Sequence, residues 1–240
     1  MPDIATRTRD QALTWTASGT RRFEHAARGL DPAEIRQATR LAGWQRGHVL
    51  THVARNADAL RNLLVWARTG VETPMYATPQ QRTLDIAAGA GRPAAEIVDD
   101  LLRADAALAE AIESLPAAAW DATVRTARGR EVPAAEVAWL RAREVWVHAV
   151  DLLAGVGMAD LPDDFVAALS AEVVGDLAAR YSGPPVLLAP VDGAGLSLPG
   201  RGDPVEAVGP AAQLLGWLIG RDFPDVHTKT GALPPLPAWL

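Results

Sequence analysis

Apolar and polar residues alternate with helical periodicity over most of the first two thirds of the chain. In the clearest stretch, apolar side chains recur three or four residues apart and so share one helix face: Val49, Leu50, Val53, Ala57, Leu60, Leu64 and Val65. Long helices are predicted over residues 5–28, 46–68, 92–115 and 133–155. Four long helices joined by loops predict a helical bundle.

Prolines and glycines indicate where these helices begin and end. The segment "DPAEI" at 31–35 begins with an N-cap aspartate followed by a proline in the first helical position. The third long helix is expected to begin near Arg92, and the fourth to begin at Pro133 and end before Gly155. The segment "TGVETPMYATP" at 69–79 breaks the helical pattern.

The pattern changes after about residue 158. Residues 160–181 predict one more helix, and short segments bounded by Pro and Gly predict strands at 184–191, 195–200 and 204–209. A last helix is predicted from Pro210 to Gly220. The chain is therefore expected to be mostly α with a small α+β part: a helical bundle over residues 1–158 and an α+β domain over residues 159–240.

Composition and charge limit the possible functions. The 240 residues are 49% apolar and 22% charged, which is typical of a folded protein and excludes general disorder. A net charge of −6 offers no basic surface for nucleic acid or an anionic membrane. No signal-peptide pattern or membrane-spanning apolar run is apparent, so a cytoplasmic protein is expected. A monomer is expected because no coiled-coil seam or long apolar patch is visible.

The chain contains no cysteine. This excludes disulfides, thiolate metal sites and a cysteine nucleophile provided by the protein. If thiol chemistry occurs here, the thiol must come from another molecule.

Glu144 and His148 lie four residues apart in the fourth predicted helix, so their side chains share one face. Such a pair is either a buried hydrogen-bonded pair or two ligands of one metal ion. His48 and His52 repeat this spacing on the second helix, and facing helices of a bundle can build a metal site between them. One of these histidines would complete the three N/O ligands of a catalytic zinc ion, which keeps one position open. Spacing does not choose between His48 and His52.

Several segments, in this order along the chain, resemble the mycothiol-dependent maleylpyruvate isomerases of the DinB-like superfamily: "GWQRGHVLTHVARNADAL", "ETPMY", "GREVPAAEVAWLRAREVWVHAVDL" and "WLIGR". The similarity extends from the first helix to the terminal "PAWL". It implies a DinB-like four-helix bundle that holds a divalent metal, usually zinc, and a smaller α+β domain that closes over it. It also implies that His52, Glu144 and His148 are the metal ligands, with His48 as a neighbour.

The resemblance implies a reaction as well, the cis–trans isomerisation of maleylpyruvate to fumarylpyruvate in aromatic (gentisate) catabolism. Mycothiol would supply a thiolate that adds reversibly to the conjugated double bond, which then rotates as a single bond. The metal would either bind the thiol sulfur or polarise the carbonyl oxygens of the dicarboxylate substrate. The sequence leaves both roles open.

Four further residues are candidates for the site. By resemblance, Arg221 and Arg82 are expected to bind the carboxylate groups of the substrate, and Arg221 also to act in catalysis. Alternatively, Arg221 is a cation at a helix C-terminus and Arg82 forms a surface salt bridge. By spacing alone, Asp151 is placed to hold the second ring nitrogen of His148 or, equally, to pair with a nearby arginine, and Asn56 to line the same cavity.

Two other functions fit the same pattern. The first is a metal-dependent S-transferase that moves a low-molecular-weight thiol onto electrophiles and consumes it, whereas an isomerase regenerates its thiol. The second is a non-catalytic helical binding protein, in which the Glu144–His148 pair is structural and no metal is bound.

Overall fold

The computed structural model describes residues 7–229 and 231–239. The chain divides into two compact units. One extends from Thr8 to Val156, and the other begins at Gly157 and also includes Arg7. Within the described residues, no helix combines the length and the apolar character needed to cross a membrane.

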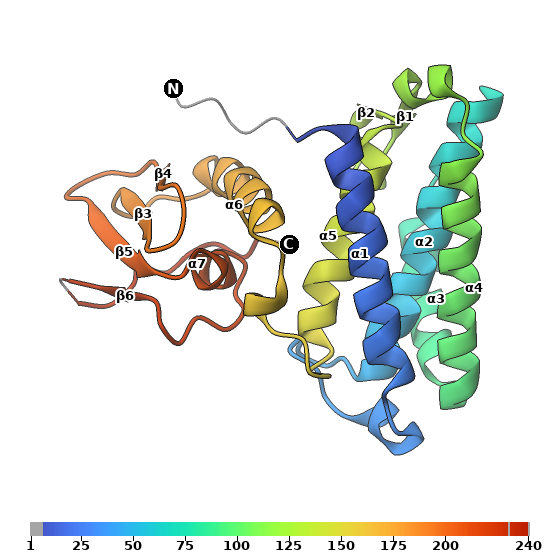
Figure 1. Cartoon of the computed structure of the whole chain (residues 1–240), viewed down its shortest axis with the longest axis horizontal. Coiled ribbons are helices and arrows are strands. Elements are labelled where there is room, and N and C mark those ends of the chain that lie inside the picture. The colour runs from blue at the N-terminus through green and yellow to red at the C-terminus, as the bar shows by residue number, and fades with distance from the viewer. Residues whose placement is uncertain (1–6, 230, 240) are drawn as a thin grey trace. The chain divides into compact units, whose positions relative to one another are not determined.

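The first unit is a four-helix bundle, as predicted. In Figure 1 its long helices lie side by side: α1 (Arg9–Arg28), α2 (Arg46–Thr69), α4 (Ala94–Glu113) and α5 (Glu136–Asp151). Helices α1 and α2 each pack against both α4 and α5, so the four helices enclose one apolar core. Large side chains in this core, such as Phe23, Leu60 and Trp139, are almost completely buried.

Shorter elements connect the bundle helices, and the sequence pattern anticipated only some of them. The "DPAEI" segment forms a 3-10 turn with the expected aspartate cap. A hairpin of β1 (Thr123–Arg125) and β2 (Glu131–Pro133) precedes α5, so Pro133 ends a strand instead of opening the helix. Helix α3 (Pro79–Ala90) packs on α2. Its inward face is short, with Ile86 and Ala90 as its buried apolar residues, and gives little periodicity.

The second unit combines two helices with a small sheet (Figure 1): α6 (Asp163–Ala178), β3 (Val186–Pro190), β4 (Leu196–Leu198), β5 (Val205–Gly209), α7 (Ala211–Leu218) and β6 (His227–Thr228). The strand order is β4-β3-β5-β6, in which β3 and β5 are parallel and the other pairs antiparallel. The predicted helices and all three predicted strands, β3, β4 and β5, are present. Strand β6 was not predicted because two residues are too few to show alternation.

Candidate metal centre

Three side chains from two facing helices converge in the bundle. Helix α2 provides His52, and helix α5 provides Glu144 and His148 from one face. Nε2 of His52 lies 3.1 Å from Nε2 of His148 and 3.0 Å from Oε2 of Glu144, and the third side of the triangle, from His148 Nε2 to Glu144 Oε2, is 3.4 Å. These three side chains form a group that could hold a metal ion. They are called the metal triad below.

The geometry of the triad fits ligands of one ion better than hydrogen-bonded partners. Glu144 Oε2 is buried and has no hydrogen-bond partner among the described residues, although two imidazole nitrogens lie within 3.4 Å. A buried acceptor without a donor is costly unless something else binds it. Tetrahedral N and O ligands about 2.0–2.1 Å from a zinc ion lie roughly 3.3 Å from each other, close to the three distances observed. The residues present therefore fit a divalent metal ion.

Burial and charge set the protonation of the triad. Burial lowers the pKa of His52, so its ring is neutral near pH 7 and has a lone pair to give. Burial alone would raise the pKa of Glu144, but the adjacent His148 and His52 imidazoles hold it well below its usual value. Burial would also lower the pKa of His148, yet Asp151 and Glu144 together raise it to about 9. Without a metal, His148 is therefore the cationic imidazole of the triad, between the carboxylates of Glu144 and Asp151.

The carboxylate of Asp151 holds the outer nitrogen of His148. Asp151 Oδ2 lies 2.9 Å from His148 Nδ1, and the Asp151 side chain is fully buried. This contact favours a proton on Nδ1, so that Nε2 offers its lone pair to the triad once His148 gives up its second proton. The structure thus places Asp151 where its spacing predicted.

Arg82 and Trp44 border the other imidazole. Arg82 Nη2, from α3, lies 3.2 Å from His52 Nδ1, and the ring of Trp44 meets the His52 ring edge-on with 5.6 Å between centroids. Because arginine only donates, His52 Nδ1 is the acceptor in this arrangement. Sequence reasoning missed Trp44, since an isolated tryptophan before a helix carries no signal of its neighbours.

His48 lies outside the metal triad, although it shares the helix face of His52. Its Nδ1 accepts a hydrogen bond from the backbone N–H of Gln45 at 3.3 Å, across the first turn of α2. Its ring packs against Trp44 with 6.1 Å between centroids. The structure therefore resolves the choice that spacing left open and brings His52 to the cluster.

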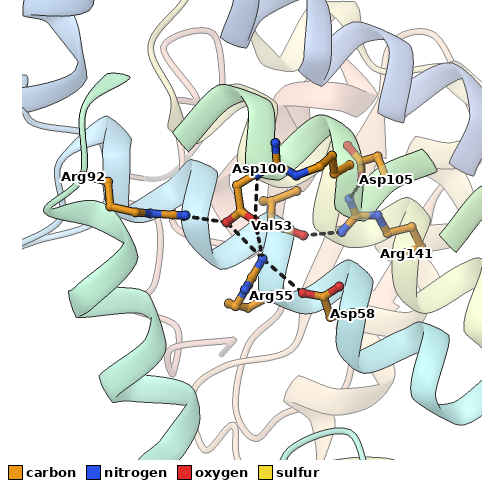
Figure 2. A network of polar contacts seen from close by, with 8 residues as sticks. Val53, Arg55, Asp58, Arg92, Asp100, Asp105 and Arg141 are labelled. Carbon is orange, nitrogen blue, oxygen red and sulfur yellow. Dashed lines mark hydrogen bonds and ion pairs between the residues drawn. The ribbon is translucent and has the colours of Figure 1, made fainter. Parts of the chain in front are cut away.

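A second buried cluster lies one helical turn from the triad. Arg141 of α5 is fully buried and donates hydrogen bonds of 2.8 Å to the carbonyl of Val53 and to Oδ1 of Asn56, both on α2. It also forms an ion pair with Asp105 of α4. Figure 2 shows the guanidinium reaching Val53 beside Asp105. We call Arg141, Asn56 and Asp105 the arginine clamp, because they tie α2, α4 and α5 together next to the metal triad.

Asn56, which was expected to line the cavity of the site, has a hydrogen-bond partner on α5. Its side-chain oxygen is engaged by Arg141 in the arginine clamp. The α2–α4 contact continues outward through Arg55, which binds Asp100 at 3.0 Å and Asp58 at 3.1 Å, and Arg92 also binds Asp100 (Figure 2). These pairs are partly exposed and contribute less than a buried one.

Arg46 fixes the opposite end of the same helix pair. Its Nε and Nη2 donate to the carbonyls of Leu152 and Leu153 at 2.8 and 2.6 Å, and Nη1 pairs with Glu34 at 3.0 Å. Helices α2 and α5 are thus antiparallel, because Arg46 donates to the carbonyl of Leu152 while the carbonyl of Val53 accepts from Arg141. The metal triad lies between these two anchors. The only sequence feature that pointed to Arg46 and Arg141 was an arginine among apolar residues of a predicted helix.

Arg221 belongs to the second unit, just after α7. Its backbone N–H donates to the carbonyl of Gly216 at 2.7 Å, and its Nη1 donates to the carbonyl of Ile219 at 2.6 Å. The second contact resembles a cation that binds carbonyls at a helix C-terminus. Its predicted action on the substrate stays a prediction.

Comparison with known proteins bears on the whole chain. A family profile described as "Mycothiol maleylpyruvate isomerase N-terminal domain" matches residues 16–153. Two crystal structures are similar over 100% of both chains, each with 34% sequence identity and a TM-score of 0.92. They are a mycothiol-dependent maleylpyruvate isomerase and a mutant of such an enzyme in which one histidine is replaced by alanine. No curated protein matches the chain.

Proposed function

The chain belongs to the mycothiol-dependent maleylpyruvate isomerase family, and on that premise we propose that it isomerises maleylpyruvate to fumarylpyruvate with mycothiol as its thiol cofactor. The observation that carries this proposal is the metal triad, whose buried Glu144 oxygen faces two imidazole nitrogens without accepting a hydrogen bond. A divalent ion held there would suit a reaction that develops negative charge.

Reversible thiolate addition accounts for the isomerisation without net consumption of any group. The sulfur forms a bond to one alkene carbon, and the electron pair of the double bond moves toward the conjugated carbonyl oxygen as an enolate. The former double bond rotates as a single bond, and the electron pair then returns and expels the thiolate. The chain has no cysteine, so the sulfur comes from the cofactor.

The chain contributes ligands and their orientation. We propose that His52, Glu144 and His148 hold zinc, a borderline-soft ion suited to nitrogen, oxygen and sulfur ligands. When bound there, a divalent ion supplies positive charge that favours the thiolate form of a thiol or stabilises negative charge on a carbonyl oxygen. Asp151 keeps the His148 ring in the ligating tautomer, and the arginine clamp and Arg46 keep α2 and α5 in register.

Arg82 is proposed to bind a substrate carboxylate. Its present partner is His52 Nδ1, which accepts its hydrogen bond. A neutral histidine that ligates through Nε2 carries its proton on Nδ1 and no longer accepts. Metal loading would therefore leave Arg82 without this acceptor, and a carboxylate of the substrate is a matched replacement.

We also propose that the segment 159–240 completes the active site through Arg221, which would bind and polarise the substrate. The protein is proposed to act in the cytoplasm, where low-molecular-weight thiols stay reduced, and as a monomer. Light scattering after size-exclusion chromatography tests the latter, with a mass near 25.4 kDa expected.

The decisive experiment joins metal content to thiol-dependent turnover. Protein purified without chelator is expected to hold about one zinc per chain and to isomerise maleylpyruvate only with mycothiol present. His52→Ala should lose the metal and lower the rate about a thousandfold or more, because a metal centre supplies several kcal/mol of transition-state stabilisation.

His48→Ala is the matched control, since it removes an imidazole one turn away that lies outside the triad. Fumarylpyruvate formed while the mycothiol concentration stays constant supports the isomerase. Mycothiol consumed in proportion to product would instead show an S-transferase. No bound metal, together with a fully active His52→Ala variant, would refute the site.

A further inference from the structure

The two histidines of the metal triad are held differently at their outer nitrogens. The Nδ1 of His148 lies 2.9 Å from the carboxylate of Asp151, which accepts the Nδ1 proton of a histidine that ligates through Nε2. The Nδ1 of His52 instead faces the guanidinium of Arg82 at 3.2 Å, and a guanidinium accepts no hydrogen bond. Among the described residues, no oxygen accepts a hydrogen bond from His52 Nδ1. The ligating orientation of His52 is therefore left to packing.

The ring of Trp44 supplies this packing. It meets the His52 ring edge-on, with 5.6 Å between the ring centroids and an interplanar angle of 74°. These values are those of a favourable T-shaped aromatic pair. The ring of His148 also meets His52 edge-on, with 4.8 Å between centroids. Because His52 is only 5% exposed and packed on these sides, its ring has little room to rotate while the indole stays in place.

A tight turn over residues 39–44, directly before α2, fixes the backbone of Trp44. The backbone N–H of Thr39 donates to the carbonyl of Trp44 at 3.0 Å, and the N–H of Trp44 donates to the carbonyl of Leu41 at 2.9 Å. The hydroxyl of Thr39 also donates to the Trp44 carbonyl, at 3.0 Å. Gly43 closes the turn with a φ of 78°, a left-handed conformation that glycine adopts without strain. Both backbone groups of Trp44 are thus occupied within the turn.

The same turn is attached to the residue that orients the other histidine. The backbone N–H of Arg40 donates to the carbonyl of Asp151 at 3.3 Å, at the end of α5. Asp151 is the residue whose carboxylate holds His148. The turn therefore reaches both histidine ligands, His52 through an aromatic ring and His148 through the backbone of Asp151. The proposed reaction assigns no role to this turn.

We propose that Trp44 is a positioning residue of the metal centre, whose ring holds His52 in the orientation that directs Nε2 at the ion. This inference rests on the metal site of the proposed function. The indole acts through His52 and takes no part in the chemistry. A ligand that is held in its binding orientation beforehand loses less freedom when the ion binds, so the affinity for the metal is higher.

The test begins with two substitutions of Trp44. Trp44→Leu keeps an apolar side chain at this half-buried position but removes the aromatic ring. We expect its affinity for zinc, measured by competition with a chelator, to fall about 3- to 10-fold, as for the loss of an aromatic pair. Trp44→Phe keeps a ring and should recover most of the affinity. An unchanged affinity in Trp44→Leu would overturn the inference.

Trp120→Leu is the matched control, because it makes the same change at the other end of α5. Trp120 is 7% exposed, and its carbonyl accepts from the N–H of Ala135 at 2.9 Å, just before α5 begins. This variant should lower the urea midpoint of unfolding and keep its zinc affinity within about twofold of the wild type. An equal loss of affinity in Trp120→Leu and Trp44→Leu would show a general effect of stability and overturn the inference.

His48→Ala removes the second imidazole that Trp44 contacts, at 6.1 Å between centroids. Its zinc affinity should equal that of the wild type. A loss as large as that in Trp44→Leu would assign the effect of Trp44 to His48, which contradicts the inference.

NMR of metal-free protein separates failure of this inference from failure of the proposed function. Three-bond couplings from the backbone to Cγ of each histidine report whether its side chain occupies one rotamer. In chelator, Trp44→Leu should give rotamer-averaged couplings at His52, while those of His148, held by Asp151, should stay as in the wild type. This result would support the positioning role even if the wild type bound no zinc and isomerised nothing, in which case the proposed function alone would fail. Unchanged couplings at His52 would overturn the inference, whatever the activity.

Discussion

The metal triad and the arginine clamp are neighbouring polar clusters between the same two helices, and they treat their buried groups differently. In the arginine clamp, a fully buried guanidinium donates to a carbonyl and an amide oxygen and pairs with a carboxylate. In the metal triad, two nitrogens and one carboxylate oxygen instead lie within 3.4 Å of one another. Buried atoms without a hydrogen-bond partner among the described residues occur in both clusters: Glu144 Oε2 in the triad, and Asp105 Oδ2 and Arg141 Nε in the clamp.

This difference separates a structural cluster from a functional one. Charges that are buried for the fold need partners, because an unpaired buried charge costs several kcal/mol. Ligand atoms that converge on one centre to bind an ion are not held there by a full set of hydrogen bonds, so the fold must hold them together by other means. The arginine clamp and Arg46 supply that support on either side of the triad. Stability and chemistry are thus assigned to different residues of the same helix pair.

The largest effect on stability is expected in the arginine clamp. Arg141→Met keeps the volume but leaves Asp105 buried without its cation, which should lower the free energy of unfolding by about 3–5 kcal/mol. Burial already raises the pKa of Asp105 against the effect of Arg141, so the loss should shrink toward low pH as the carboxyl becomes protonated. Urea unfolding in chelator, at two pH values, measures both.

Two further variants sharpen this result. The double variant Arg141→Met/Asp105→Leu should recover most of the stability, because it removes both charges together. Glu144→Gln in the triad should cost less than Arg141→Met in chelated protein, although it abolishes metal binding. A larger loss of unfolding free energy in Glu144→Gln than in Arg141→Met would contradict the division into a functional triad and a structural clamp. Arg103→Met, which alters an exposed arginine on α4, serves as a control.

A smaller effect is expected where Asp151 supports the triad. Asp151→Asn keeps an acceptor for His148 Nδ1 but removes its charge, so metal affinity should fall about 10- to 100-fold. The pKa of His148 in metal-free protein should also fall from its value of about 9, since Asp151 is one of the two groups that raise it. Competition with a chelator measures the first change, and NMR titration the second.

A purely structural Asp151 would alter unfolding without moving either quantity. Asp160→Asn provides a comparison, because this carboxylate accepts from the backbone N–H of Gly157 in the second unit.

Much of the fold could be predicted from the sequence, and individual elements show why. Helix α2 extends over residues 46–69 because its apolar residues recur at one face, and the prediction of 46–68 differs by one residue. The hairpin before α5 could not be predicted, because each strand has three residues and one buried side chain. Pro133 was consequently taken for a helix start, which is a position proline also favours.

Helical spacing predicted only those contacts of the site that join residues of one helix. The Glu144–His148 pair and Asp151 follow from residues three and four apart on α5. Choosing His52 over His48 required the resemblance, because both occupy one face of α2. Arg141 and Arg46 could not be assigned from sequence, since an arginine in a helix is usually exposed. Their partners lie on other helices, and only packing reveals them.

The expected pH dependence of metal binding contrasts the two uses of buried charge once more. His148 has a pKa of about 9 in metal-free protein, so below that pH it must release a proton before it can ligate. Burial keeps His52 neutral, so one proton is released, and affinity should fall about tenfold per pH unit as the pH drops from 9 toward 7.

The stability of metal-free protein should change in the opposite sense. The pKa of His148 lies above its ordinary 6.5 because of Asp151 and Glu144, so its charge stabilises the fold fully below pH 6.5. That contribution is lost as the pH rises through about 9, where metal binding becomes strongest. Calorimetry in buffers of different ionisation enthalpy counts the proton, and urea unfolding in chelator follows the stability. Metal affinity that stays constant between pH 7 and pH 9 would show that His148 is already neutral and that Asp151 does not hold it as a cation.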